Sequence, residues 1–229
     1  MSAYNQLVLK IFPVSNQYFP ANLPEIRPEI LPEYFNQHPD IINKHPYLAD
    51  LLRIEYVCYL IKNDQSPVLT ELTKRAINPT LELVPVQWSG LPDFLVTPSC
   101  EPKKEEGLVM IYKKLDTGTI YVENPSGHDL LAIKLTCENI SSSQAAREGN
   151  TSIGTIDDIL YTAIDRGFIL EPHSKLIRDS SFRRSSSILP EYFSAQTFTL
   201  QWHITQKCDL HCRHCYDRSD RKPLKLDQA

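Results

Sequence analysis

The sequence predicts an α+β protein: a helical N-terminal region, a unit of three strands followed by three helices, and a C-terminal strand that leads into a cysteine-rich loop. Three observations support this fold class. Apolar residues recur with helical spacing over 46–61, strand-like and then helix-like segments follow one another over 79–169, and apolar and polar residues alternate over 198–205. The regions that follow from this pattern are 1–78, 79–170, 171–196 and 197–229.

The composition is that of an ordinary globular protein. The chain has 229 residues, of which 41% are hydrophobic and 23% charged, and its net charge is −4. It contains no apolar run near the roughly 18 residues that a membrane span needs, and no secretory signal. The slightly acidic balance gives no reason to expect nucleic acid. We expect a cytoplasmic protein without a membrane or nucleic-acid partner.

The N-terminal region combines a proline-rich arm with one strong helix. Each proline removes a backbone donor and disfavours helix at the residue before it. We therefore expect an irregular arm over 1–40, with one short helix near 32–37. Pro46 begins a helix over 46–61, because a first-turn proline needs no donor. A further short helix is predicted over 69–77. The prolines of the arm are Pro13, Pro20, Pro24, Pro28, Pro32 and Pro39.

Residues 79–169 read as one compact unit with the order β-β-β-α-α-α. Gly118 can supply the positive φ that the turn of a hairpin needs. Between the first strand and the hairpin we expect a loop that contains Pro92, Pro98, Pro102 and a Lys-Lys-Glu-Glu run. The predicted strands are 80–88, 108–113 and 119–123, and the predicted helices are 126–138, 142–148 and 155–166.

Three scattered cysteines, Cys58, Cys100 and Cys137, do not form the spacing of a disulfide framework. Cys58 and Cys137 lie in apolar helical patterns, so we expect free, buried thiols.

The remaining cysteines, Cys208, Cys212 and Cys215, have the spacing C-x₃-C-x₂-C. Three thiolates so spaced can hold three corners of a cubane iron–sulfur cluster and leave the fourth iron open. This loop resembles that of the radical S-adenosylmethionine (radical SAM) superfamily, whose pattern is C-x₃-C-x-Φ-C, with His214 in the Φ position. The alternating segment 198–205 then matches the first strand of that family's partial (β/α) barrel.

The resemblance implies a [4Fe–4S] cluster on Cys208, Cys212 and Cys215, and S-adenosylmethionine on the open iron. It also implies that His214 and Tyr216 lie near the adenine side of that cofactor. An electron donor would reduce the cluster, S-adenosylmethionine would be cleaved to a 5′-deoxyadenosyl radical, and this radical would take a hydrogen from a peptide substrate.

Two other readings of the cysteine loop stay open. His211 or His214 could complete a zinc site, although structural zinc sites usually pair two well-separated units and only one is present. The chain would then be a winged-helix interaction or regulatory module with a structural zinc loop. A redox pair, Cys212 and Cys215, would leave Cys208 unexplained.

The order β-β-β-α-α-α over 79–169 is similar to a winged-helix unit, and more specifically to the PqqD-like precursor-recognition element of ribosomal-peptide maturases. Short stretches also resemble maturases of the thio(seleno)oxazole or selenobiotic type. The resemblance implies that a leader peptide adds to the edge of 119–123 and packs near 156–163. Pure scaffolding is one alternative. DNA binding is another, but Asp157 and Asp158 have the wrong charge for phosphate contact.

A (β/α) barrel takes roughly 200–250 residues. We therefore expect this chain to be the N-terminal part of a radical SAM enzyme and inactive by itself, with 216–229 poorly packed. The serine-rich segment 171–196 is expected to be a flexible linker. The run Ile-Leu-Pro-Glu-Tyr-Phe occurs twice, at 30–35 and 188–193. The sequence does not reveal the substrate, the bond formed, auxiliary clusters or the oligomeric state.

Overall fold

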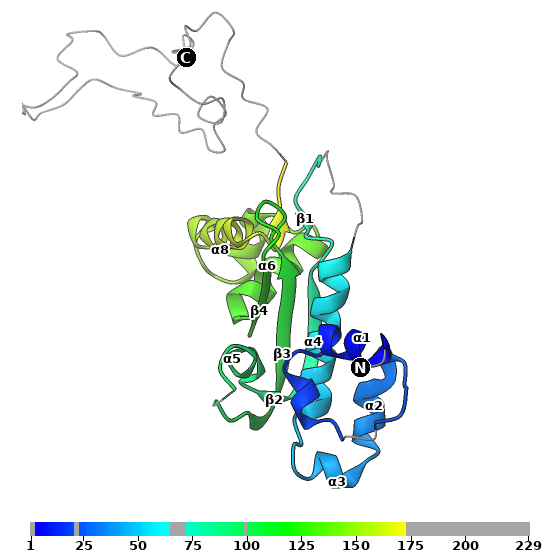
Figure 1. Ribbon diagram of the computed structural model, residues 1–229. Helices are drawn as coiled ribbons and strands as arrows, with labels where there is room; N and C mark the ends of the chain where they lie inside the picture. The colour runs from blue at the N-terminus through cyan, green and yellow to red at the C-terminus, as the bar shows by residue number, and fades with distance from the viewer. Residues whose placement is uncertain (1–2, 21–22, 65–71, 99, 173–229) are drawn as a thin grey trace, which may run out of the picture. The chain divides into compact units, whose positions relative to one another are not determined.

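The computed structural model describes residues 3–20, 23–64, 72–98 and 100–172 (Figure 1). The chain divides into two compact units, 1–172 and 173–229, so the description that follows concerns the first. Within it helices and strands are mixed, as the predicted α+β class requires. None of the helices in these ranges is both long and apolar enough to cross a membrane.

The N-terminal region is more helical than expected. Helix α1 (Ala3–Ile11) ends before Pro13, so the prolines of the arm do not affect it, and the prediction of an irregular start was wrong. The predicted short helix is present as α2 (Leu31–Asn36). The remaining elements of the arm are the 3₁₀ turns η1 (Ser15–Tyr18) and η2 (Pro28–Ile30) and the short helix α3 (Pro39–Ile42).

Helix α4 (Leu48–Asn63) confirms the strong helical pattern that begins at Pro46. It is buried on more than one side, since Leu48 and Leu52 pack against α1 and α2 while Leu51 and Ile54 pack against the sheet. The helix predicted over 69–77 is not found in its described part. Ala76–Ile77 forms a short strand, β1, which pairs antiparallel with β5 (Ile169–Leu170).

The main sheet has three antiparallel strands in the order β2-β3-β4. Strands β2 (Glu82–Ser89), β3 (Lys103–Lys113) and β4 (Ile120–Glu123) confirm the three predicted strands. The loop expected between the first two is shorter than predicted. Helix α5 (Leu91–Val96) starts with Pro92 in its first turn, and the charged run from Lys103 is the exposed start of β3.

The three helices after the sheet also follow the prediction. They are α6 (Gly127–Cys137), α7 (Ser142–Glu148) and α8 (Ile153–Arg166). Serine hydroxyls accept a backbone N–H at the start of each, and Ser126 forms a full capping box with Asp129. Gly167 ends α8 with φ +90°, and Gly118 has the positive φ expected in the hairpin.

Helices cover both faces of the sheet (Figure 1). Val109 and Ile111 of β3 point into a core shared with α4 and α5, whereas Met110 and Tyr112 point into a core shared with α6 and α8. Successive side chains of a strand alternate between faces, so all four residues are buried. The backbone N–H and C=O groups of the strands lie in the plane of the sheet, so it can offer them to a partner only at its edges.

Candidate functional site

The metal and cofactor residues expected from the sequence all lie outside the described residues. They are Cys208, Cys212, Cys215, His214 and Tyr216. Within the part of the chain that the structure describes, no three or more His, Cys, Asp or Glu side chains gather as a metal site.

The three other cysteines are only partly as expected. Cys58 is half-buried, and burial, with the nearby charge of Glu55, raises the pKa of its thiol to about 12. Cys100 and Cys137 are exposed, which corrects the expectation of buried thiols. Cys137, the last residue of α6, comes two residues after the buried Leu135. The two side chains therefore point to nearly opposite sides of the helix, and Cys137 lies on the exposed side. The raised pKa keeps the Cys58 thiol protonated at neutral pH, so it is a poor nucleophile.

The edge of the sheet at β4 is a candidate site for a peptide. Residues Ile120–Glu123 pair with β3 only, and no other described strand lies beside them. Lys114 N–H donates to Thr119 O at 2.8 Å, so Lys114 and Thr119 form a hydrogen-bonded pair at the start of the β3–β4 hairpin. This pair shows which of the following residue pairs are hydrogen-bonded and which are not. Since bonded and non-bonded pairs alternate, the backbone groups of Ile120 and Val122 face away from β3. These outward groups can therefore accept an additional strand.

The opposite edge, at β2, is protected. Pro85 lies opposite Leu108 and has no N–H to offer. The register shifts between Val86 and Trp88, and at this irregularity the Gln87 N–H donates to Asp50 Oδ2 at 2.6 Å. Proline, an irregular register and a covering side chain are all means by which proteins block an edge strand. Strand addition is therefore favoured at β4.

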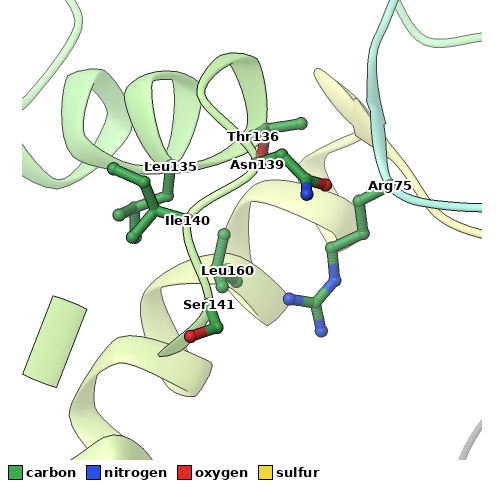
Figure 2. A pocket seen from close by; sticks show the side chains of 7 residues that line it. All are labelled: Arg75, Leu135, Thr136, Asn139, Ile140, Ser141 and Leu160. Atoms are coloured by element: carbon green, nitrogen blue, oxygen red, sulfur yellow. The ribbon is translucent and has the colours of Figure 1, made fainter. Parts of the chain in front are cut away.

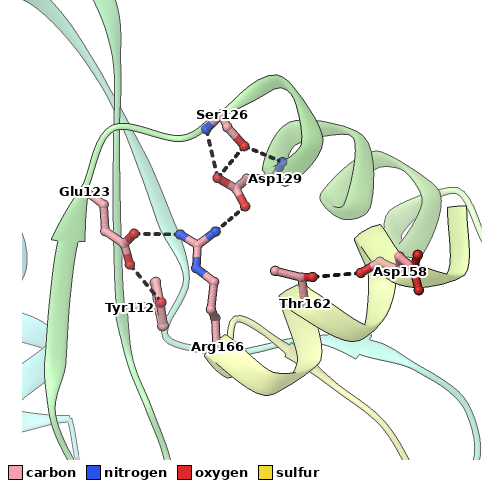
Figure 3. A network of polar contacts seen from close by, with 7 residues as sticks. All are labelled: Tyr112, Glu123, Ser126, Asp129, Asp158, Thr162 and Arg166. Carbon is pink, nitrogen blue, oxygen red and sulfur yellow. Dashed lines mark hydrogen bonds and ion pairs between the residues drawn. The ribbon is translucent and has the colours of Figure 1, made fainter. Parts of the chain in front are cut away.

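A charged network fixes the end of β4 to the helices (Figure 3). Arg166, the last residue of α8, bonds Glu123 of β4 at 2.6 Å and also bonds Asp129 of α6. Partial burial by itself would lower the pKa of Arg166, because it disfavours the charged form. The nearby carboxylates of Glu123 and Asp129 have the larger combined effect and raise this pKa. Tyr112 donates its hydroxyl to Glu123 at 2.9 Å, and burial and this bond raise the pKa of Tyr112. The network ties the end of β4 to α6 and α8 through Arg166, and to β3 through Tyr112, so it sets the position of the strand end.

The residues named for a second peptide contact on α8 turn out to belong to the core. Ile156, Leu160 and Ala163 are each at most 3% exposed and pack against the sheet. The side chains of α8 that are accessible include Ile153 and Tyr161, about half exposed. A peptide on this helix would therefore meet its outer side and not the positions expected from the sequence.

A cavity of about 240 Å³ lies between α6, the start of α7 and α8 (Figure 2). Its floor is apolar, with Leu135, Ile140 and Leu160, and Arg75 points toward it. Arg75 is held by a 3.8 Å ion pair between its Nε and Glu171. The Ser141 hydroxyl accepts the Gln144 N–H at the start of α7. The described residues that line the cavity include one cation, which is ion-paired, and a serine hydroxyl, which is already bonded, and no acid–base pair that could serve catalysis.

Two buried carboxylates of α4, Asp50 and Glu55, were not anticipated, since in the sequence they are ordinary polar residues of a helix. Both Glu55 oxygens accept backbone N–H groups, from Val14 at 2.6 Å and from Ser15 at 3.0 Å. Burial raises the pKa of both carboxyls, against the lowering effect of these hydrogen bonds. Both serve the fold, because they fasten the N-terminal arm and β2 to α4.

Comparison of the sequence with protein-family models and with curated proteins finds no match. The assignment of function therefore depends on the cysteine motif and on the geometry of the β4 edge.

Proposed function

We propose that the chain carries the cluster-binding loop of a radical SAM enzyme that modifies a peptide, and that residues 79–170 recognise this peptide. The observation that carries the proposal is the spacing of Cys208, Cys212 and Cys215 after the alternating segment 198–205. The open edge of β4 supports the second part.

The donor set fits an iron–sulfur cluster. Clusters are held by cysteine thiolates, and three at this spacing suit three irons of a [4Fe–4S] cluster. Zinc in a structural site takes four ligands, so it would need His211 or His214 in addition. When bound, the cluster and S-adenosylmethionine supply one-electron chemistry. The three cysteines hold the cluster, and His214 and Tyr216 are proposed to contact S-adenosylmethionine.

Peptide recognition is proposed to occur by strand addition at β4. The outward backbone groups of Ile120 and Val122 would pair with an extended peptide and supply affinity irrespective of its sequence. Tyr121, which is 38% exposed and stacks on Tyr112 with ring centroids 5.3 Å apart, would contact alternate side chains of the peptide. Arg166 keeps Glu123 in place at the end of the strand. Backbone pairing thus gives affinity, and the flanking side chains give selectivity.

Reconstitution without oxygen tests the cluster. The purified chain is incubated with iron and sulfide, desalted, and measured by visible absorption and by metal and sulfide analysis. We expect a broad visible charge-transfer band that Cys208→Ala abolishes. Cys100→Ala is the matched control, because Cys100 is exposed and outside the motif, and it should leave the band unchanged. Stoichiometric zinc without sulfide in the protein would favour the zinc-binding regulatory module instead.

Peptide recognition is tested separately. Synthetic peptides for each small reading frame next to the gene are titrated against the chain by fluorescence anisotropy. We expect one of them to bind, and Val122→Pro to weaken its binding at least about tenfold by removing an outward donor. Lack of binding by every neighbouring peptide would contradict this part and leave the cluster assignment untouched.

A further inference from the structure

The cavity between α6, the start of α7 and α8 has no role in the proposed function. Its volume is about 240 Å³, and none of the residues that line it belongs to β4 or to the cysteine motif. Drug-sized ligands occupy pockets of roughly 300–1,000 Å³, so this cavity suits a smaller molecule. The chemistry of that molecule follows from the two kinds of wall that the cavity has.

One wall is apolar and firmly placed. Leu135 of α6 and Leu160 of α8 are 4% and 2% exposed, and both belong to the core between the sheet and these helices. Ile140, which follows α6, packs against the same core. Because core side chains are closely packed, this wall keeps its shape whether the cavity is filled or empty. It therefore favours a small apolar group.

The other wall is polar. Figure 2 shows the Arg75 guanidinium and the Asn139 amide on the side of the cavity away from Leu135 and Ile140. Asn139 has φ +53°, a left-handed conformation that turns the chain after α6, and asparagine adopts it more readily than most residues. Its side-chain amide adds donor and acceptor groups beside the charge of Arg75.

Arg75 is held more loosely than the arginine of the β4 network. Its ion pair with Glu171 joins Nε to the carboxylate at 3.8 Å, beyond the distance of a hydrogen bond, and no described residue hydrogen-bonds its guanidinium. Arg166, in contrast, bonds Glu123 at 2.6 Å and also bonds Asp129. Arg75 thus keeps the planar donor fork with which arginine binds a carboxylate through two parallel bonds.

A simpler role for Arg75 would be to cap α6, because the carbonyls at the end of a helix attract cations. The last carbonyls of α6, however, already accept backbone N–H groups from the turn that follows. The pairs are Lys134 with Glu138, Leu135 with Ile140, and Thr136 with Asn139. Capping therefore leaves the donors of the guanidinium unused.

We propose that this cavity binds a monocarboxylate that carries a small apolar group. Arg75 is the ion-pair partner of the carboxylate, and Leu135 and Leu160 contact the apolar group. A single cation neutralises one negative charge, so a carboxylate suits the site better than a phosphate. Two sources have this chemistry, a free short-chain acid and the C-terminal residue of a peptide. The site depends on neither the cluster nor the β4 edge.

NMR titration of the full chain with sodium isocaproate tests the site. We expect saturable shifts of the Ile140 amide and of the methyl groups of Leu135 and Leu160. Isocaproamide has the same shape without the charge, and acetate has the charge without the apolar group. Both should bind at least about tenfold more weakly. Equal binding of isocaproate and isocaproamide, or shifts that leave these three residues unchanged, would overturn the proposal.

Arg75→Gln tests the ion pair from the side of the protein. It should weaken isocaproate binding at least about tenfold. Arg27→Gln is the matched control, because Arg27 is an exposed arginine that pairs with Glu29 at 3.4 Å and does not line the cavity. Both variants should keep the native Tm, since exposed ion pairs contribute little to stability. Unchanged binding by Arg75→Gln would contradict the proposal, and if this variant lost stability, the comparison of isocaproate with isocaproamide in the native chain would still decide.

A parallel titration with acetyl-Gly-Gly-Leu distinguishes the two sources. If this peptide binds more tightly than isocaproate, with the same shifts, the ligand is the C-terminal residue of a peptide. If isocaproate binds more tightly, the ligand is a free acid. Saturable binding by neither would overturn the site itself.

Discussion

The two edges of the main sheet are built in opposite ways. At β2, Pro85 offers no donor and Asp50 accepts the N–H of Gln87. At β4, the outward groups of Ile120 and Val122 have no strand beside them among the described residues. An unprotected edge strand invites aggregation, so proteins usually block both edges. Among the described residues, the sheet is blocked at β2 and has no strand beside β4, and this difference is what supports the proposed role of β4.

The contrast extends to how charge is placed. Beside β2, a carboxylate that is 4% exposed satisfies a backbone group directly. Beside β4, Arg166 and Glu123 are about one-third exposed, and they bond each other and not the outward groups of the strand. Charge at β2 therefore covers a backbone donor of the edge, whereas the ion pair at β4 holds the strand end and does not cover the outward groups of Ile120 and Val122.

Proline substitutions in β4 test this contrast with the largest expected effect. Tyr121→Pro removes a donor that faces β3 and should cost about 3 kcal/mol of unfolding free energy or more. Val122→Pro removes an outward donor and should cost about 1 kcal/mol, mainly through the lost side-chain packing. Urea denaturation measures both. Equal costs would show that the assignment of inward and outward groups is wrong.

The protection of β2 is tested by Asp50→Ala. Removal of the carboxylate leaves the Gln87 N–H without its acceptor, so we expect a loss of about 2 kcal/mol in unfolding free energy. Asp50→Asn keeps an acceptor oxygen and should lose less. Asp93→Ala, at an exposed residue of α5, is the control and should change stability by less than about 0.5 kcal/mol. If Asp50→Ala matched this control, β2 would not depend on its covering carboxylate.

The junction between α8 and the β4 hairpin is tested at Gly167. This residue has φ +90°, and a Cβ there would lie 2.9 Å from Lys114 Cγ. Gly167→Ala should therefore cost about 1–2 kcal/mol. Gly107→Ala is the matched control, because Gly107 has open space around its Cα and no positive φ. Thermal unfolding should lower Tm for the first variant and not for the second.

A smaller, pH-dependent effect is expected at Glu55. Burial raises its folded pKa above the ordinary value of 4.5. The folded state therefore binds the proton more readily than the unfolded state, so this group's contribution to stability increases as pH falls from neutral toward 4.5. The unfolding free energy of the native chain minus that of Glu55→Gln should rise over this range. A difference that stays constant with pH would mean that the Glu55 carboxylate is not penalised by burial.

The sequence allowed the long elements to be predicted, because their signals are local. Pro46 and the apolar repeat after it locate α4, and Gly118 and Gly167 mark a turn and a helix end. Some predicted loops were wrong because proline, which usually marks a loop, is also tolerated in the first turn of a helix. Pro92 was read as part of a loop, yet it occupies the first turn of α5, where proline is tolerated.

Features that depend on distant contacts could not be predicted. Ala76 forms a strand because Leu170 pairs with it, and a two-residue pairing has no sequence pattern of its own. Asp50 is buried because the irregular part of β2 packs over it. Arg166 was placed at the end of a helix, but its partner Glu123 lies 43 residues away in the chain. Such long-range contacts make up the candidate site.

Amide hydrogen exchange by NMR tests the open edge most directly, because it needs no ligand. We predict fast exchange for the outward amides of Ile120 and Val122 and slow exchange for the inward amides of Tyr121 and Glu123. Protection of Ile120 and Val122 equal to that of their two neighbours would show that the edge of β4 is already covered, and would contradict strand addition at this site.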